Sequence, residues 1–169
     1  MLVKDMDEVR LVRRIRVWLA VFIAGLVLSG VTAFPLVWET GLLLKIVQHL
    51  APSTGTVVWV QRVHEGLVAT GQRYPFLAYG TDWLAFAHLV LAVAFVGPWR
   101  DPVRNKWVLQ FGLIACAAVI PLALIAGPMR GIPLWWRLGD CCFGVCGTIP
   151  LWFALRDVKA LEADAILQA

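Results

Sequence analysis

The sequence is poor in charged and chemically reactive side chains. Only 15% of its 169 residues are charged, and it contains three histidines and four cysteines. Soluble domains are about 25% charged. The low charge excludes a disordered chain, and the ordinary cysteine content excludes a disulfide-rich secreted scaffold. Phosphate-binding loops, dinucleotide fingerprints and the His-Glu-x-x-His and Gly-x-Ser-x-Gly motifs are also absent, so no complete catalytic signature is present.

The chain is rich in hydrophobic residues, which make up 60% of the sequence, and its mean hydropathy is +0.77. Four segments, about residues 17–37, 81–99, 107–128 and 136–155, are apolar over a length that can cross a bilayer, and none has the polar face of a soluble helix. Tryptophans gather at or near their ends, as is typical of the membrane interface. We predict an all-α, four-helix transmembrane bundle in which residues 1–169 form a single membrane domain.

The basic residues predict the orientation of the spans. With the N-terminus in the cytoplasm, five Lys or Arg before the first span, three between the second and third and two in the tail, ten in all, lie on the cytoplasmic side. Five lie on the other side. The positive-inside rule therefore predicts a multi-pass protein of the cell inner membrane with both termini cytoplasmic. Because topology accounts for the net charge of +4, no nucleic-acid partner is predicted.

A long segment separates the first two spans on the predicted outer side. Apolar residues recur at helical spacing in residues 38–50 and again in 54–70, which favours two amphipathic helices on the outer membrane surface or over the bundle. The β-branched residues of 54–70 leave a strand as the alternative. Small residues predict the contacts between spans, on the first span at Gly25, Ser29 and Ala33 and on the fourth at Gly139, Cys142 and Cys146.

The ionisable residues of the spans and outer loops converge on the predicted outer side. Intramembrane ionisable groups are costly and point to function. We predict a polar pocket built from His64, Glu65, Asp82, His88, Arg130, Arg137 and Asp140. Ordinary structural roles are the alternative: Asp82 and Asp140 cap helix N-termini, Arg137 pairs with Asp140, and His88 hydrogen-bonds a neighbouring helix.

Three functions fit such a pocket. The first is binding of a ligand or of a membrane-protein partner without chemistry, which we take as the main hypothesis. The second is a redox role with haem b, in which His64 and His88 are axial ligands and Arg130 and Arg137 pair with the propionates. The third is a cofactor-free enzyme on a lipidic substrate, with catalytic residues His88, Asp82, Asp140 and Glu65. The histidines and carboxylates lack the close spacing of a mononuclear metal site.

Two stretches carry a resemblance. Residues 73–83, Arg-Tyr-Pro-Phe-Leu-Ala-Tyr-Gly-Thr-Asp-Trp, and residues 127–133, Gly-Pro-Met-Arg-Gly-Ile-Pro, resemble small four-span bacterial membrane proteins of unassigned function. The resemblance covers most of the chain. It implies the four-span fold and implies no activity.

Overall fold

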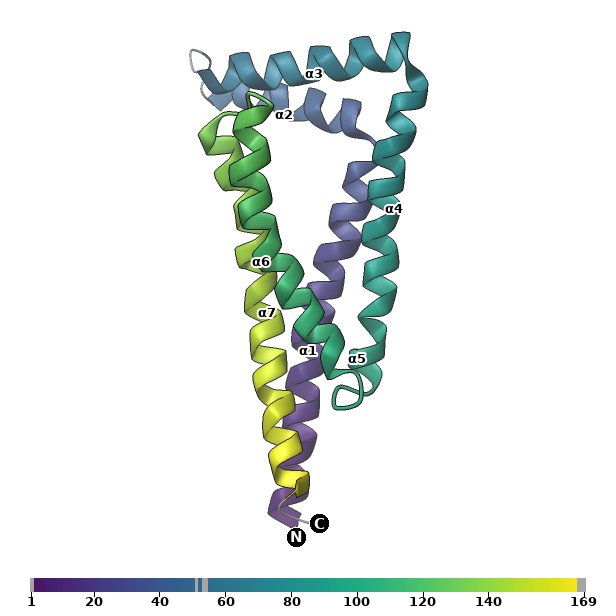
Figure 1. The fold of residues 1–169 in the computed structure, drawn as a ribbon, viewed down its shortest axis with the longest axis vertical. Coiled ribbons are helices and arrows are strands. Elements are labelled where there is room, and N and C mark those ends of the chain that lie inside the picture. The colour runs from purple at the N-terminus through teal and green to yellow at the C-terminus, as the bar shows by residue number, and fades with distance from the viewer. Residues whose placement is uncertain (1, 51, 53–54, 167–169) are drawn as a thin grey trace. The chain divides into compact units, whose positions relative to one another are not determined.

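The computed structural model describes residues 2–50, 52 and 55–166, with side chains for 6–50, 52 and 55–163. Its regular elements are α1 (Leu2–Ala33), α2 (Leu36–Leu50), α3 (Gly55–Arg73), η1 (Pro75–Leu77), α4 (Ala78–Ala94), α5 (Val96–Arg100), α6 (Lys106–Met129) and α7 (Leu134–Ile166) (Figure 1). No strand occurs among the described residues, so the all-α prediction is confirmed and the strand alternative for 54–70 is wrong. Residue 54, where that segment was predicted to begin, lies outside the described residues.

Four helical segments are long and apolar enough to cross a membrane, in agreement with the sequence. They are Met6–Ala33, Pro75–Arg100, Lys106–Met129 and Leu134–Ala163. The third matches the predicted 107–128 to within one residue at each end. The four segments fit a multi-pass membrane protein.

The first span ends earlier than predicted, at Ala33 instead of residue 37. Pro35 explains the difference, since proline has no amide N–H and disfavours a helical conformation at the residue before it. The helix therefore stops at Ala33, and α2 starts at Leu36, one residue after the proline. Helix α2 thus follows the first candidate span directly.

The second and fourth spans begin earlier than predicted, and this changes the position of two carboxylates. Pro75 opens the short helix η1 that leads into α4, and Pro133 precedes α7 at Leu134, since proline is readily accommodated where a helix begins. Asp82 is therefore the fifth residue of α4, and Asp140 is the seventh residue of α7. Neither first turn contains an acidic residue, so the capping interpretation of both is wrong.

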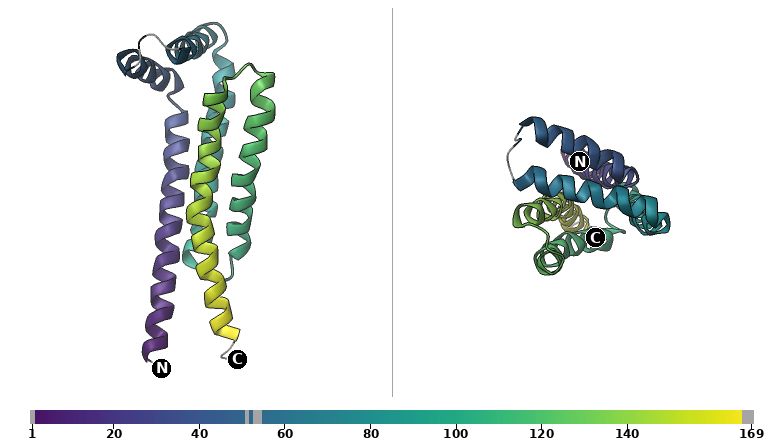
Figure 2. Two further views of the ribbon diagram at one scale, coloured as in Figure 1. Left: turned by 90° about the vertical axis from the view of Figure 1, so that its left-hand side faces the viewer. Right: turned by 90° about the horizontal axis from the view of Figure 1, so that it is seen from above.

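The chain packs as two compact units, of which the first comprises the described residues up to Gly25 and those from Ala92 onward. Its fully buried side chains include Ile15, Leu19, Phe95, Leu109, Leu151 and Val158. Aromatic rings join its segments: Trp18 stacks on Phe153 with centroids 5.0 Å apart, and the Phe22 and Phe95 centroids are 4.6 Å apart. α6 and α7, joined by a short turn, pack side by side in this unit (Figure 2).

Glycines allow the close approach of α6 and α7, but they are not the small residues that the sequence predicted for this contact. A Cβ on Gly144 would overlap the carbonyl oxygen of Cys116, and a Cβ on Gly147 would lie 2.8 Å from the Cys116 Sγ. Cys142 and Cys146 are instead exposed, and a Cβ on Gly139 would meet nothing within 4 Å. The predicted contact line on the fourth span is therefore wrong: the true one runs through Gly144 and Gly147.

The second unit comprises residues Leu26–Leu91. In it α2 and α3 lie side by side, and η1 connects α3 to α4 (Figure 1). The end of α1 approaches α4 at Gly30, where a Cβ would lie 2.9 Å from the Ala85 carbonyl oxygen. Neither α2 nor α3 is among the segments apolar enough to span a membrane. Helices α2 and α3 are thus separate from the four candidate spans.

Candidate ligand-binding site

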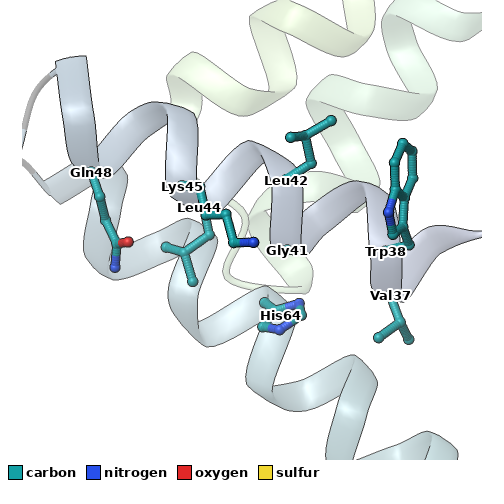
Figure 3. A pocket seen from close by; sticks show the side chains of 8 residues that line it. All are labelled: Val37, Trp38, Gly41, Leu42, Leu44, Lys45, Gln48 and His64. Atoms are coloured by element: carbon teal, nitrogen blue, oxygen red, sulfur yellow. The ribbon is translucent and has the colours of Figure 1, made fainter.

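A cavity of about 460 Å³ lies in the second unit, beside the contact between α2 and α3. Its volume is within the usual range for small-molecule sites. Its walls are both apolar and polar, and the residues that line it are Val37, Trp38, Gly41, Leu42, Leu44, Lys45, Gln48 and His64 (Figure 3). Seven of these come from α2, and His64 comes from α3.

His64 is held by a hydrogen bond between the two helices. Its Nδ1 lies 3.1 Å from the hydroxyl oxygen of Thr40, a buried residue of α2. The Thr40 hydroxyl is also 2.7 Å from the Leu36 carbonyl oxygen, which accepts its single proton. The hydroxyl oxygen therefore accepts from His64 Nδ1–H. The described residues form no hydrogen bond with Nε2, which is thus available to a ligand.

Gly41 lets the imidazole lie against the backbone of α2. A Cβ at this position would be 3.1 Å from His64 Cε1, closer than ordinary van der Waals contact. A larger side chain would displace the ring or fill the cavity. The ring is thus fixed on one edge by Thr40 and lies against Gly41 on another.

The polar lining favours an anion. Lys45 carries a full positive charge, Gln48 adds an amide, and the described residues place neither Lys45 nor His64 in an ion pair. Within the described part of the chain, no carboxylate lines the cavity. The nearby Glu65 is exposed and accepts a hydrogen bond from Gln61 at 2.8 Å. Cationic and amide donors without a resident carboxylate are suited to a carboxylate or phosphate group.

The other predicted site residues of this unit do not line the cavity. Asp82 lies half-buried in α4. His88, farther along α4, is also half-buried, and its Nδ1 lies 2.8 Å from the Leu84 carbonyl oxygen. The hydrogen bond expected from His88 to a neighbouring helix is thus made within its own helix. The predicted catalytic roles of Asp82 and His88 stay predictions.

Arg130, Arg137 and Asp140 belong to the first unit. Arg130 directly follows α6 as its C-cap residue, and its amide donates to the Ala126 and Gly127 carbonyl oxygens. The aliphatic part of Arg137 packs on Gly127, and its Nε is buried without a hydrogen-bond partner in the described structure. The described residues contain no ion pair between Arg137 and Asp140, so that alternative is wrong. The common pocket that joins them to His64 stays a prediction.

Most of the cavity has little signal in the sequence. Trp38, Lys45 and Gln48 fit the amphipathic pattern of the sequence, and Thr40 resembles an ordinary helix residue. A glycine in the middle of an amphipathic helix does indicate close approach of another element, and Gly41 carries that signal. Among the described residues, no group of three or more His, Cys, Asp or Glu is arranged to hold a metal ion.

Comparison with known proteins suggests no function for this chain, so a functional proposal depends on the geometry of the cavity. No family model, curated protein sequence or solved structure matches this chain.

Proposed function

We propose that the protein is a membrane ligand-binding protein whose α2–α3 cavity takes an amphiphile with one anionic group. One observation carries the proposal: the fixed imidazole of His64 and the ammonium of Lys45 share a cavity with apolar walls and, among the described residues, without a carboxylate. The anionic group would bind the Lys45 ammonium and would accept a hydrogen bond from His64 Nε2–H of the imidazolium form, in which both ring nitrogens donate. The apolar part would lie along Val37, Leu42 and Leu44.

The surroundings of the cavity support an amphiphilic ligand. α2 follows the first span with only two residues between them, so its N-terminal end is close to the membrane boundary. Its surface is apolar and exposed at Trp38 (68%) and Leu50 (76%). A site this near to the bilayer is reached readily by molecules that partition into it.

The distribution of basic residues supports an outer location. It favours both termini in the cytoplasm of a cell with an inner membrane, which puts the α2–α3 pair on the extracytoplasmic side. A reporter that is active only in the cytoplasm, fused after residue 169, tests the C-terminus, and its inactivity would overturn this orientation.

The binding experiment uses the full chain in phosphatidylcholine nanodiscs and tritium-labelled dodecanoate, with empty nanodiscs as the background. Dodecyl phosphate should compete, which tests whether the site takes either anion. Acetate and inorganic phosphate test the contribution of the apolar part, and dodecyltrimethylammonium tests the charge. We expect competition by the anionic amphiphile and little by the other three.

Matched variants locate the binding. Lys45→Gln and His64→Gln should each weaken dodecanoate binding about tenfold, the scale of one charge-assisted hydrogen bond. Arg62→Gln, which removes one positive charge from the exposed surface of α3, should leave it unchanged. Equal effects of all three variants, or equal competition by the cationic amphiphile, would overturn the proposal.

Haem b is a second candidate, favoured by one observation. In both His64 and His88 the ring uses Nδ1 for an internal hydrogen bond, and the described structure gives neither Nε2 a partner. Histidines that bind metals commonly have this arrangement. Addition of haemin to the purified protein tests it: a Soret band that His88→Ala and His64→Ala abolish would support haem, and an unchanged free-haemin spectrum would remove it.

A further inference from the structure

Several cations of the first unit have no carboxylate partner among the described residues. The ion pairs of those residues use Arg14 and Arg156, both with Asp157, and Lys106 with Glu162. The exposed basic residues that remain outside these pairs are Arg10, Arg13, Arg16, Arg100, Arg104, Arg130 and Lys159. Positive charges without internal compensation attract an external anion.

Arg16 is the most strongly oriented of these cations. Its Nε donates a hydrogen bond to the Trp99 carbonyl oxygen at 3.3 Å. Its guanidinium carbon also lies 5.4 Å from the centroid of the Trp99 ring, a cation–π contact. The described structure gives the two terminal amino groups no partner. They form the end of a planar fork, which is suited to two phosphate oxygens.

The loop after Trp99 holds two further arginines in place. Asp101 accepts the Arg104 amide at 3.1 Å. The Asn105 side-chain amide donates to the Gly97 carbonyl oxygen at 3.4 Å and to the Asp101 carbonyl oxygen at 2.9 Å. Arg100 and Arg104 are therefore carried by a hydrogen-bonded turn.

These arginines stand where the apolar segments end. Arg16 immediately precedes the uncharged stretch that starts at Val17, and Arg100 is the last residue of the second candidate span. Trp99 and Trp107 are exposed on either side of the loop, as is typical of residues at headgroup level. The anion present at that depth is the phosphate of a phospholipid.

We propose that Arg13, Arg16, Trp99, Arg100 and Arg104, the Arg16–Trp99 cluster, bind the headgroup of an anionic phospholipid. The fork of Arg16 takes the phosphate oxygens, and the other arginines favour a headgroup with net negative charge over a zwitterionic one. The cluster lies in the other unit from the α2–α3 cavity, so this proposal stands independently of the proposed function.

Native mass spectrometry of the detergent-solubilised full chain tests the proposal. Dioleoyl phosphatidylglycerol and dioleoyl phosphatidylcholine have the same acyl chains and differ in headgroup charge. We expect the protein to retain phosphatidylglycerol about tenfold better, and millimolar inorganic phosphate not to displace it. Displacement by inorganic phosphate would mean that free phosphate is the true ligand, and equal retention of both lipids would overturn the proposal.

Arg73 provides a matched control, because it is exposed and its guanidinium lies 5.5 Å from the Tyr74 ring centroid in the other unit. Arg16→Gln should reduce the preference for phosphatidylglycerol at least fivefold, and Arg73→Gln should not change it. Arg16→Lys keeps the charge and loses the fork, so it should give an intermediate preference. Trp99→Leu, which removes the ring and keeps the carbonyl group, should also weaken the preference. Equal effects of Arg16→Gln and Arg73→Gln would overturn the proposal.

Discussion

The contact between α6 and α7 at Gly144 gives the sharpest prediction about stability. Gly144 is buried, and a Cβ there would overlap the backbone carbonyl oxygen of Cys116. A backbone oxygen cannot rotate away, so Gly144→Ala must push the two helices apart. Gly139 lies on the same helix and is exposed, and a Cβ added to it would meet nothing within 4 Å, which makes Gly139→Ala the matched control.

The size of the effect follows from two terms. Replacing glycine by alanine in a helix contributes up to about 1 kcal/mol, and this gain is shared by both variants. Overpacking of a close contact costs about 1–3 kcal/mol and applies to Gly144→Ala alone. The free energy of unfolding of Gly144→Ala should therefore lie about 1–3 kcal/mol below that of Gly139→Ala.

Reversible unfolding by sodium dodecyl sulfate in mixed micelles, followed by circular dichroism, measures this difference. Reactivity of Cys116 with a maleimide gives a second readout in a background where Cys141, Cys142 and Cys146 are alanine, since Cys116 is buried against Gly147. The thiol should react faster in Gly144→Ala. Equal unfolding free energies and equal Cys116 reactivity in the two variants would refute the close packing of α6 on α7.

Three further variants test other contacts. Asp157→Asn should lower the free energy of unfolding by about 1–2 kcal/mol. This is less than the roughly 3–5 kcal/mol lost when a fully buried ion pair is broken, because the side chains of Arg14 and Arg156 are half exposed, at 51% and 52%. An unchanged free energy of unfolding would mean that these ion pairs do not form. Leu109→Ala should cost about 2–5 kcal/mol, whereas Ile114→Ala, on the same helix and 69% exposed, should cost less than half as much in the same unfolding assay, and equal losses would contradict the described core. Thr40→Val should weaken dodecanoate binding about threefold, because His64 loses its hydrogen bond, and unchanged affinity would contradict a positioning role.

The sequence predicted the spans well and the ends of some helices less well. Long apolar stretches are a strong signal, so residues 107–128 match α6 closely. Helix ends depend on single prolines, and Pro35, Pro75 and Pro133 moved three boundaries. The shifts at Pro75 and Pro133 removed the capping roles of Asp82 and Asp140.

The site was harder to predict, because cavities depend on packing between segments that are distant in sequence. His64 was predicted as a site residue, and the structure places it against α2, a contact that was not predicted. Gly41 and Lys45 were not predicted as site residues. Gly41 has no side chain, and Lys45 fits the polar face of any amphipathic helix. The contact of Gly144 with Cys116 was missed for the same reason: small residues are frequent in these spans, and only packing shows which of them form a contact.

The hydrogen bonds of the polar side chains give a reason to place function at His64. In an apolar helix a hydroxyl or imidazole commonly bonds to the carbonyl group one turn earlier. Thr32, His88 and Thr148 follow this pattern, with Leu28, Leu84 and Gly144 as acceptors. His64 departs from it, because its partner Thr40 lies on another helix and its ring faces a cavity. A side chain that does not bond to its own helix backbone is positioned by tertiary packing. Here that packing places His64 in the lining of a cavity with Lys45 and apolar residues, which is the observation behind the proposed binding site.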